Sequence, residues 1–246
     1  MLDTSSPIPL YYQLKATIED HIQSGHWKPG DRLPSESQLG QQFQISRTTI
    51  RQALGDLVNQ GLLVRIQGKG TFVAEPRIQQ RLARLTGFTQ DMRARGQKAA
   101  SQVLQLDVIP APPQVGKPLQ LSLDETVIVL KRLRLADGTP MAVETAYLVY
   151  RLCKDLLNED LAIYSLYSLL AQKLNLTPAR AVQQLEATAC PSLEARLLGI
   201  PKASPVLHIH RTTFDQHGQP FEQVESFYRG DRYVFQAELS SEMLSG

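Results

Sequence analysis

An amphipathic pattern between Ser46 and Gly61 limits the possible folds of this chain more than any other segment. Ser46 is a residue type that commonly caps the start of a helix, and Gly61 commonly ends one. The apolar residues between them recur at the spacing of one helix face; they are Ile50, Ala53, Leu54, Leu57 and Val58. Polar residues near the start lie mainly off that face; they are Arg47, Thr48, Thr49, Arg51 and Gln52. The sequence therefore predicts a helix with one buried face and a polar, basic N-terminal end in solvent.

Two further helical patterns precede this helix. The first covers residues 9–24, where apolar residues recur at four-residue spacing. The second begins at Ser35, which together with Gln38 matches a capping box, and it ends near Gln44. Residues 28–31 between them are Lys-Pro-Gly-Asp, which is a turn by composition. The first part of the chain is therefore expected to be helical, with a short second helix.

A hairpin follows the third helix. Residues 62–73 are typical of two short strands around a glycine-rich tip at residues 68–70. Helix, short helix, turn, helix and hairpin in this order form a winged helix-turn-helix, and we assign residues 1–74 to it. In such a motif the first residues of the third helix reach base edges in the major groove, where arginine pairs with guanine and threonine contacts a thymine methyl group or a phosphate. Each charge alone is equally consistent with a solvated helix face, but the ordered set favours DNA binding.

The candidate DNA-binding residues come from the start of the third helix, the wing tip and the turn before the second helix; they are Arg32, Ser35, Ser46, Arg47, Thr48, Thr49, Arg51, Gln52, Gly68, Lys69, Gly70 and Thr71. Four motifs here resemble the DNA-binding domain of GntR-family regulators: PLYYQ at 9–13, PGDRLPSE at 29–36, SRTTIRQAL at 46–54 and GKGTFV at 68–73. The resemblance implies operator contacts by Arg47, Thr48, Thr49, Arg51 and Gly68. Ser37 stands where many family members have arginine, so the resemblance does not extend to operator preference.

Charge is unevenly distributed along the chain. The formal net charge is +2, with basic side chains in excess before residue 99 and acidic side chains in excess after it. This distribution favours a nucleic-acid contact on the N-terminal side.

No apolar run reaches the length of a membrane span, and the start of the sequence lacks the pattern of a secretory signal, so we expect a cytoplasmic protein with no membrane partner. Cys153 and Cys190 lie outside any CxxC pattern, and we expect two reduced thiols.

The region after the wing has a different organisation. Residues 75–85 are polar and basic, and we expect a linker there. Residues 86–246 are expected to form a second domain that binds an effector and dimerises. Strand-like runs predominate in it, and turn residues at 137–138 and 217–218 join neighbouring runs as hairpins; the runs are 101–109, 126–136, 141–149, 182–189, 206–215 and 220–228, with helical patterns at 165–174 and 192–198. The predicted fold class is multidomain α+β, with an antiparallel sheet in the C-terminal domain.

Motifs across this second region resemble the effector domain of the HutC subgroup of GntR regulators, the UTRA domain. They are LTGFTQDM at 85–92, KRLR at 131–134, PMAVE at 140–144, SLY at 165–167, LGI at 198–200 and FYRGDRY at 227–233. The similarity covers nearly all of residues 86–240. It implies a chorismate-lyase-like fold that binds a small metabolite, and the pattern is most similar to regulators that respond to amino-sugar phosphates. Gly87 and residues 147–149 depart from the family pattern.

Candidate effector-binding residues follow from chemistry and from this resemblance. Arg132 and Arg134 alternate on one face of a predicted strand, where two guanidinium groups can bind a phosphate or carboxylate. Ser165 is at a predicted helix start, which favours an anion. Ordinary surface residues of an amphipathic strand are the alternative. The resemblance implies a pocket lined by Phe88, Thr89, Arg132, Arg134, Glu144, Ser165, Tyr167, Glu222 and Tyr228.

Signatures of catalysis are missing from the sequence. It contains no HExxH, GxSxG, P-loop or GxGxxG pattern. His208 and His210 share a strand face, but no third metal ligand is evident near them in sequence, so we expect no metal, no cofactor and no catalytic residue.

The leading hypothesis is a dimeric repressor that binds pseudo-palindromic double-stranded operator DNA and is controlled by a small anionic effector. Control by a protein partner or by oxidation of Cys153 or Cys190 is one alternative. An enzyme resembling chorismate lyase is another, and the lack of a catalytic constellation counts against it.

Overall fold

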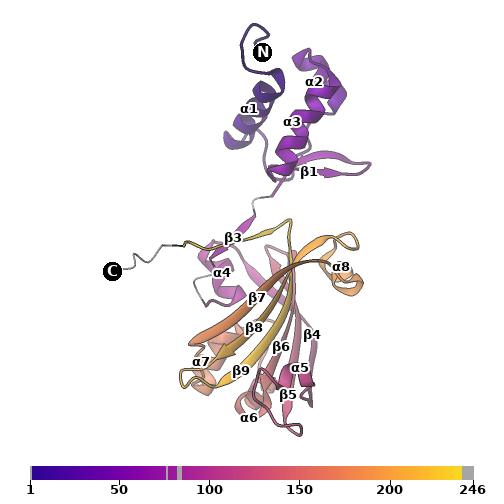
Figure 1. The fold of residues 1–246 in the computed structure, drawn as a ribbon. Helices are drawn as coiled ribbons and strands as arrows, with labels where there is room; N and C mark the ends of the chain where they lie inside the picture. The colour runs from indigo at the N-terminus through magenta and orange to yellow at the C-terminus, as the bar shows by residue number, and fades with distance from the viewer. Residues whose placement is uncertain (1, 76, 82–84, 240–246) are drawn as a thin grey trace, which may run out of the picture. The chain divides into compact units, whose positions relative to one another are not determined.

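The computed structural model describes residues 2–75, 77–81 and 85–239 (Figure 1). The chain divides into two compact units, Met1–Arg77 and Ile78–Gly246. The expected linker at 75–85 is wrong in part, because Ile78–Arg81 forms strand β3 within the second unit. Residues 76 and 82–84 of the expected linker lie outside the described residues, as do residue 1 and residues 240–246 of the two expected domains.

The first unit is a winged helix-turn-helix, as the sequence predicts. Its elements are α1 (Leu10–Gln23), α2 (Glu36–Phe43), α3 (Arg47–Asn59), β1 (Leu63–Ile66) and β2 (Gly70–Val73). Ser35 caps α2 through a complete capping box with Gln38, and Gln44 ends the helix in the left-handed conformation. The predicted stripe of α3 is the centre of the core, where Ile50, Ala53, Leu54 and Leu57 pack on residues of α1 and α2 that include Leu14, Ile18 and Leu39. Truncating such a buried leucine to alanine costs about 2–5 kcal/mol, so this packing fixes how α3 is presented.

The second unit is built on a six-stranded antiparallel sheet with strand order β4-β5-β6-β9-β8-β7. The strands are β4 (Ala99–Pro110), β5 (Thr126–Ala136), β6 (Thr139–Val149), β7 (Arg180–Ala189), β8 (Pro205–Phe214) and β9 (Pro220–Arg229). The turn between β5 and β6 has positive φ at both Asp137 and Gly138, which suits the twist of a tight hairpin. A separate parallel pair joins β3 to β10 (Tyr233–Gln236). The antiparallel α+β prediction is therefore confirmed.

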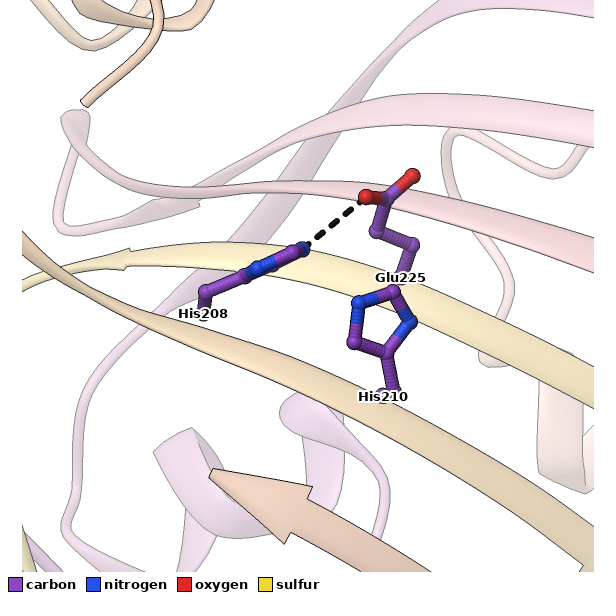
Figure 2. Close-up of side chains that lie close together, drawn as sticks. All are labelled: His208, His210 and Glu225. Carbon is purple, nitrogen blue, oxygen red and sulfur yellow. Dashed lines mark hydrogen bonds and ion pairs between the residues drawn. The ribbon is translucent and has the colours of Figure 1, made fainter. Parts of the chain in front are cut away.

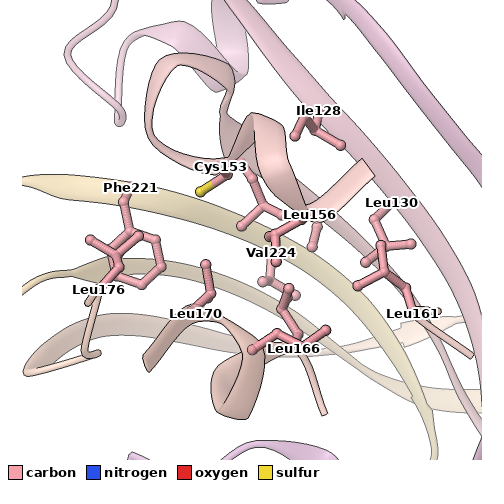
Figure 3. Packing of buried hydrophobic residues seen from close by; sticks show 13 residues of the cluster. Ile128, Leu130, Cys153, Leu156, Leu161, Leu166, Leu170, Leu176, Phe221 and Val224 are labelled. Carbon is pink, nitrogen blue, oxygen red and sulfur yellow. The ribbon is translucent and has the colours of Figure 1, made fainter. Parts of the chain in front are cut away.

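Helices cover the two faces of this sheet unequally. One face packs against α6 (Tyr150–Cys153), the 3-10 helix η1 (Lys154–Asn158) and α7 (Leu166–Leu174) through the cluster shown in Figure 3. The other face carries α5 (Pro113–Gly116) over one part and α8 (Ser192–Leu198) over another, each with its own small apolar cluster. Strand register decides which face a residue joins, because neighbouring residues along a strand point to opposite faces.

None of the helices in the described part of the chain is long and apolar enough to cross a bilayer. Cys153 and Cys190 are both buried and carry no disulfide. Burial raises the pKa of the Cys153 thiol to about 12, and it raises that of Cys190 as well. Both sulfurs are therefore held in the unreactive protonated form.

Candidate operator and effector sites

The N-terminal end of α3 presents the side chains expected to read DNA. Arg47, Thr48 and Gln52 are exposed. Ser46 instead serves the helix itself, because its hydroxyl accepts a hydrogen bond from the Thr49 backbone N–H at 3.2 Å and lies 2.8 Å from the Thr49 hydroxyl. This cap orders the first turn of α3 and so fixes the direction in which the exposed side chains project.

Arg51 is restrained by a contact that the sequence did not indicate. Its Nε donates to Glu36 Oε2 at 2.9 Å, and Arg65 Nη2 lies 3.5 Å from Glu36 Oε1. Glu36 thus joins α2, α3 and β1 through two exposed cations. Only the three-dimensional packing brings these residues together, since 15 residues separate Glu36 from Arg51.

The wing brings together the remaining operator candidates of the first unit. Gly68 and Gly70 both have positive φ, which glycine adopts without strain, and Lys69 between them is exposed. Arg32 lies against the wing, because a Cβ at Gly70 would be only 3.0 Å from Arg32 Nε. The Thr71 carbonyl accepts a hydrogen bond from the Leu33 backbone N–H, which holds this segment beside β2. The hydroxyl of Ser35 is used in the cap of α2.

On the second unit, two arginines and a glutamate from neighbouring strands form a buried ionic cluster. Arg132 and Glu144 are register partners across β5 and β6, and Arg132 Nη2 donates to Glu144 Oε1 at 2.6 Å. Arg134 Nη1 lies 3.9 Å from the same oxygen, and its Nη2 donates to the Thr89 hydroxyl at 3.2 Å. The Arg134 guanidinium also stacks 4.6 Å from the ring centroid of Phe88, which opens α4 (Phe88–Ala94). Four of these residues are nine-tenths or more buried: Phe88, Arg132, Arg134 and Glu144.

A second buried carboxylate, that of Glu222, lies near this cluster. Glu222 accepts hydrogen bonds from the hydroxyl groups of Tyr167 and Thr213, both at 2.7 Å. Arg211 of β8 lines a small cavity together with Tyr167 and Glu222, and it was not among the candidate site residues. The predicted strand at 206–215 placed Arg211 on the same face as Thr213, but no motif marked it. Tyr228 does not line the cavity; it packs in the apolar cluster with Phe88 and meets Tyr233 edge to face at 4.7 Å.

The electrostatics of the cluster leave part of its positive charge unmatched. Burial raises the pKa of Glu144, but the combined charges of Arg134, Arg132 and Arg211 outweigh it and bring the pKa down to about 2. Burial, together with the nearby Arg132, lowers the pKa of Arg134 to about 10. Within the described residues no hydrogen-bond partner is found for Arg132 Nε and Nη1, Arg134 Nε or Arg211 Nε, although all four atoms are buried. Buried donors without acceptors are costly, so this arrangement favours an added anion.

Two adjoining cavities meet at this cluster. The inner one, beside the arginines, has a volume of about 20 Å³, and the outer one has about 400 Å³. Gly87, Thr89, Ser165 and Tyr167 line both. A Cβ at Gly87 would lie 3.4 Å from the Tyr167 ring, so glycine allows the starts of α4 and α7 to approach closely where the two cavities share their lining. Ser165 is the N-cap of α7 but makes no capping hydrogen bond through its side chain.

The sequence matches two family models. Residues 10–73 match the bacterial regulatory proteins of the gntR family, and residues 94–234 match the UTRA domain. The chain is 41% identical over 234 residues to the HTH-type transcriptional repressor NagR of Bacillus subtilis (strain 168), covering 95% of this chain and 96% of the relative. It is 33% identical to the histidine utilization repressor of Pseudomonas putida over 95% of this chain and 93% of that protein. The crystal structure of PhnF from Mycobacterium smegmatis matches with a TM-score of 0.67 and 27% identity, covering 95% of this chain and all of that one.

These matches define a class of protein: a DNA-binding transcriptional regulator with a ligand-sensing domain, and not an enzyme. More narrowly, the chain belongs to the HutC subgroup of the GntR family and is a transcriptional repressor of that type with a UTRA effector domain. Regulators of this family bind operator DNA through the helix-turn-helix and small molecules through the UTRA domain.

Proposed function

We propose that this repressor acts as a homodimer whose operator affinity is set by a small anionic metabolite, a phosphorylated amino sugar, bound at the Arg132–Arg134 cluster. The observation that carries the proposal is the set of buried guanidinium N–H groups without acceptors within the described residues. A phosphate supplies several strong acceptors and matches the fork geometry of arginine. Glu144 and Glu222 supply acceptors for sugar hydroxyls or an amine, and the sequence resemblance to regulators of amino-sugar phosphates favours the same class.

The cavity volumes imply a conformational step on binding. The inner cavity of about 20 Å³ has room for little more than a water molecule, whereas the outer cavity of about 400 Å³ is large enough for a sugar. In this proposal a phosphate that reaches the arginines moves Gly87 and Tyr167, which line both cavities, away from one another. Separating the starts of α4 and α7 in this way would shift the population of dimer conformations away from those that fit the operator. A coupling free energy of about 1–3 kcal/mol is enough for such control.

The operator side of the proposal rests on the exposed polar start of α3 and on the wing. In a twofold-symmetric dimer, two such surfaces match the two halves of a pseudo-palindromic operator. Arg47, Arg51 and Gln52 are assigned to base edges or phosphates, and Arg32 and Lys69 to phosphates beside the wing. Because a repressor must reach its operator DNA, we propose that the protein acts in the cytoplasm.

A thermal-shift screen of the purified protein tests the effector assignment, using amino-sugar phosphates, sugar phosphates and carboxylic acids. A ligand that binds only the folded protein adds about 2.7 kcal/mol of stability at a hundredfold excess over its dissociation constant. We expect amino-sugar phosphates to raise the unfolding temperature and to release operator DNA. Arg132→Ala should lose both responses and still bind the operator.

Arg151→Ala is the control for Arg132→Ala, because Arg151 of α6 pairs with Glu125 just before β5 and neither residue lines the cavity beside the buried arginines. It should respond like the unmodified protein. A well-folded Arg132→Ala protein that no longer binds operator would refute the division of roles, and a response only to neutral compounds would refute the anion. Control by thiol oxidation has little support, because burial raises the pKa of both Cys153 and Cys190.

A further inference from the structure

A second polar cluster lies on the sheet face opposite the buried cluster of Arg132, Arg134 and Glu144. It consists of His208 and His210 on β8 and Glu225 on β9 (Figure 2). One nitrogen of each imidazole and one carboxylate oxygen all lie within 4.8 Å of one another. The two histidines alone lack a third ligand in sequence, but the antiparallel register supplies one, because His210 and Glu225 are direct partners across β8 and β9.

The cluster is held in place by its neighbours. His208 Nε2 lies 2.9 Å from Glu225 Oε1, and the His208 ring stacks on Phe227 with centroids 4.3 Å apart and planes inclined by 6°. The rings of His208 and His210 are also 4.3 Å apart. Both strands have hydrogen-bonded partners on either side in the sheet, so their backbones are fixed. The three ligand groups therefore converge without any rearrangement of the chain.

Two imidazoles and one carboxylate are a common zinc ligand set, and zinc holds such ligands at about 2.0–2.2 Å. A tetrahedral ion needs its ligand atoms roughly 3.3 Å apart, so these atoms must close by about 1.5 Å or less, which side-chain rotation can supply. His210 and Glu225 also line a cavity of about 660 Å³, which leaves room for a fourth ligand such as water. Glu186 lines the same cavity and is the register partner of His208, so its carboxylate is placed near the ligand groups.

We propose that His208, His210 and Glu225 bind one Zn²⁺ ion per chain, at a site separate from the effector site. His210 and Arg211 are consecutive residues of β8 that point to opposite faces of the sheet. An ion at this site would therefore link the two strands that carry Arg211 and Glu222, from the sheet face opposite those two side chains.

Zinc titration of the untagged full-length protein, after treatment with a chelator, tests the proposal by calorimetry. Co²⁺ substitution adds a spectroscopic readout, since four-coordinate cobalt absorbs much more strongly in the visible range than six-coordinate cobalt. We expect one equivalent of Zn²⁺ per chain and a four-coordinate cobalt spectrum. His210→Ala and Glu225→Gln should each weaken zinc binding at least about tenfold, because loss of a supporting group alone costs that much.

Two histidine variants serve as controls. His217→Ala removes an exposed imidazole from the turn between β8 and β9, and His26→Ala breaks the His21–His26 pair of the first unit, whose ring centroids are 4.9 Å apart. Both should bind zinc like the unmodified protein. Zinc should raise the unfolding temperature of these controls but not that of His210→Ala or Glu225→Gln, which separates a lost ligand from a damaged fold. The proposal fails if folded His210→Ala or Glu225→Gln keeps full zinc affinity, or if His26→Ala abolishes binding.

Discussion

The first and second units of this protein hold arginine side chains in opposite ways. Around α3, the Arg51 side chain is 69% exposed and shares Glu36 with Arg65, which is 49% exposed. In the buried ionic cluster of the second unit, the Arg132 and Arg134 side chains are only 3% and 4% exposed. Exposed pairs contribute little free energy and exchange readily with water, whereas buried charges depend on every neighbour that compensates them.

This difference shows how one residue type can serve two kinds of recognition. An exposed arginine can exchange a carboxylate for a phosphate at small cost, which suits contact with a DNA backbone that must also be released. A buried arginine with unmatched N–H groups favours a specific anion and makes the local structure sensitive to its presence. Substitutions in the buried cluster should therefore change mainly stability, and by a large amount. Substitutions among the exposed residues around α3 should change mainly operator affinity, and by a smaller amount.

The largest effect is expected from Glu144→Gln, which removes the carboxylate facing both buried arginines. Removing one partner of a buried ion pair costs about 3–5 kcal/mol, because the remaining charge is left uncompensated. Glu36→Gln, its counterpart among the exposed pairs, should change stability by less than about 1 kcal/mol. Urea denaturation at pH 7 measures both free energies of unfolding. Similar losses for the two variants would break the comparison between the units.

The same substitution has a characteristic pH dependence. Glu144 has a pKa of about 2 in the folded protein, below its ordinary value of 4.5, so its ionised form stabilises the fold fully above pH 4.5. That contribution disappears as the pH falls toward 2, and it amounts to about 3 kcal/mol. Unfolding free energies measured between pH 6 and pH 2 should therefore fall less steeply in Glu144→Gln than in the unmodified protein. Parallel curves would show that Glu144 is not held ionised by the arginines.

An intermediate effect is expected from Arg47→Ala at the start of α3. Loss of a base or phosphate contact should weaken operator binding by about 1–3 kcal/mol while leaving stability and effector binding unchanged. Fluorescence anisotropy with labelled operator DNA measures the change, and thermal unfolding provides the control. An operator affinity equal to that of the unmodified protein would remove Arg47 from the proposed interface.

The smallest effect is expected from Glu36→Gln on DNA affinity, and its sign sharpens the comparison. Glu36 neutralises Arg51 and Arg65 in the free protein, so its removal frees both guanidinium groups for phosphate. Operator affinity should rise about twofold to fivefold, which corresponds to the free energy of an exposed ion pair. The gain should shrink at high salt, because screening weakens both interactions. A loss of affinity would mean that Glu36 positions Arg51 for DNA instead of competing for it.

Features set by local sequence were predictable. The stripe of α3, the Ser35 cap and the alternation along β5 all follow from periodicities that a single segment contains. For this reason the sequence correctly placed Arg132 and Arg134 on one strand face. Tyr228 was expected in the pocket from its chemistry and from the family resemblance, and the structure packs it behind the cavity lining, in the apolar cluster that includes Phe88.

Features that depend on pairing between distant segments were not predictable. Arg211 joins the cavity only because β8 lies two strands from β6 in the sheet. Glu225 reaches the two histidines through the register of β8 and β9, and Glu36 meets Arg51 through the packing of α2 on α3. Strand β3 was taken for linker because its partner β10 is about 150 residues away and pairs in parallel, without a turn to signal it.

The pairing of β3 with β10 has a consequence for how such proteins diversify. The second unit begins at Ile78 with β3, and its last described strand, β10, ends at Gln236. The strands β3 and β10 are hydrogen-bonded neighbours. A folded module whose ends meet in this way can be grafted or exchanged with little strain on the polypeptide that receives it. A UTRA domain whose first and last described strands adjoin can therefore be joined to a DNA-binding unit as one piece, with both of its connections at the same edge.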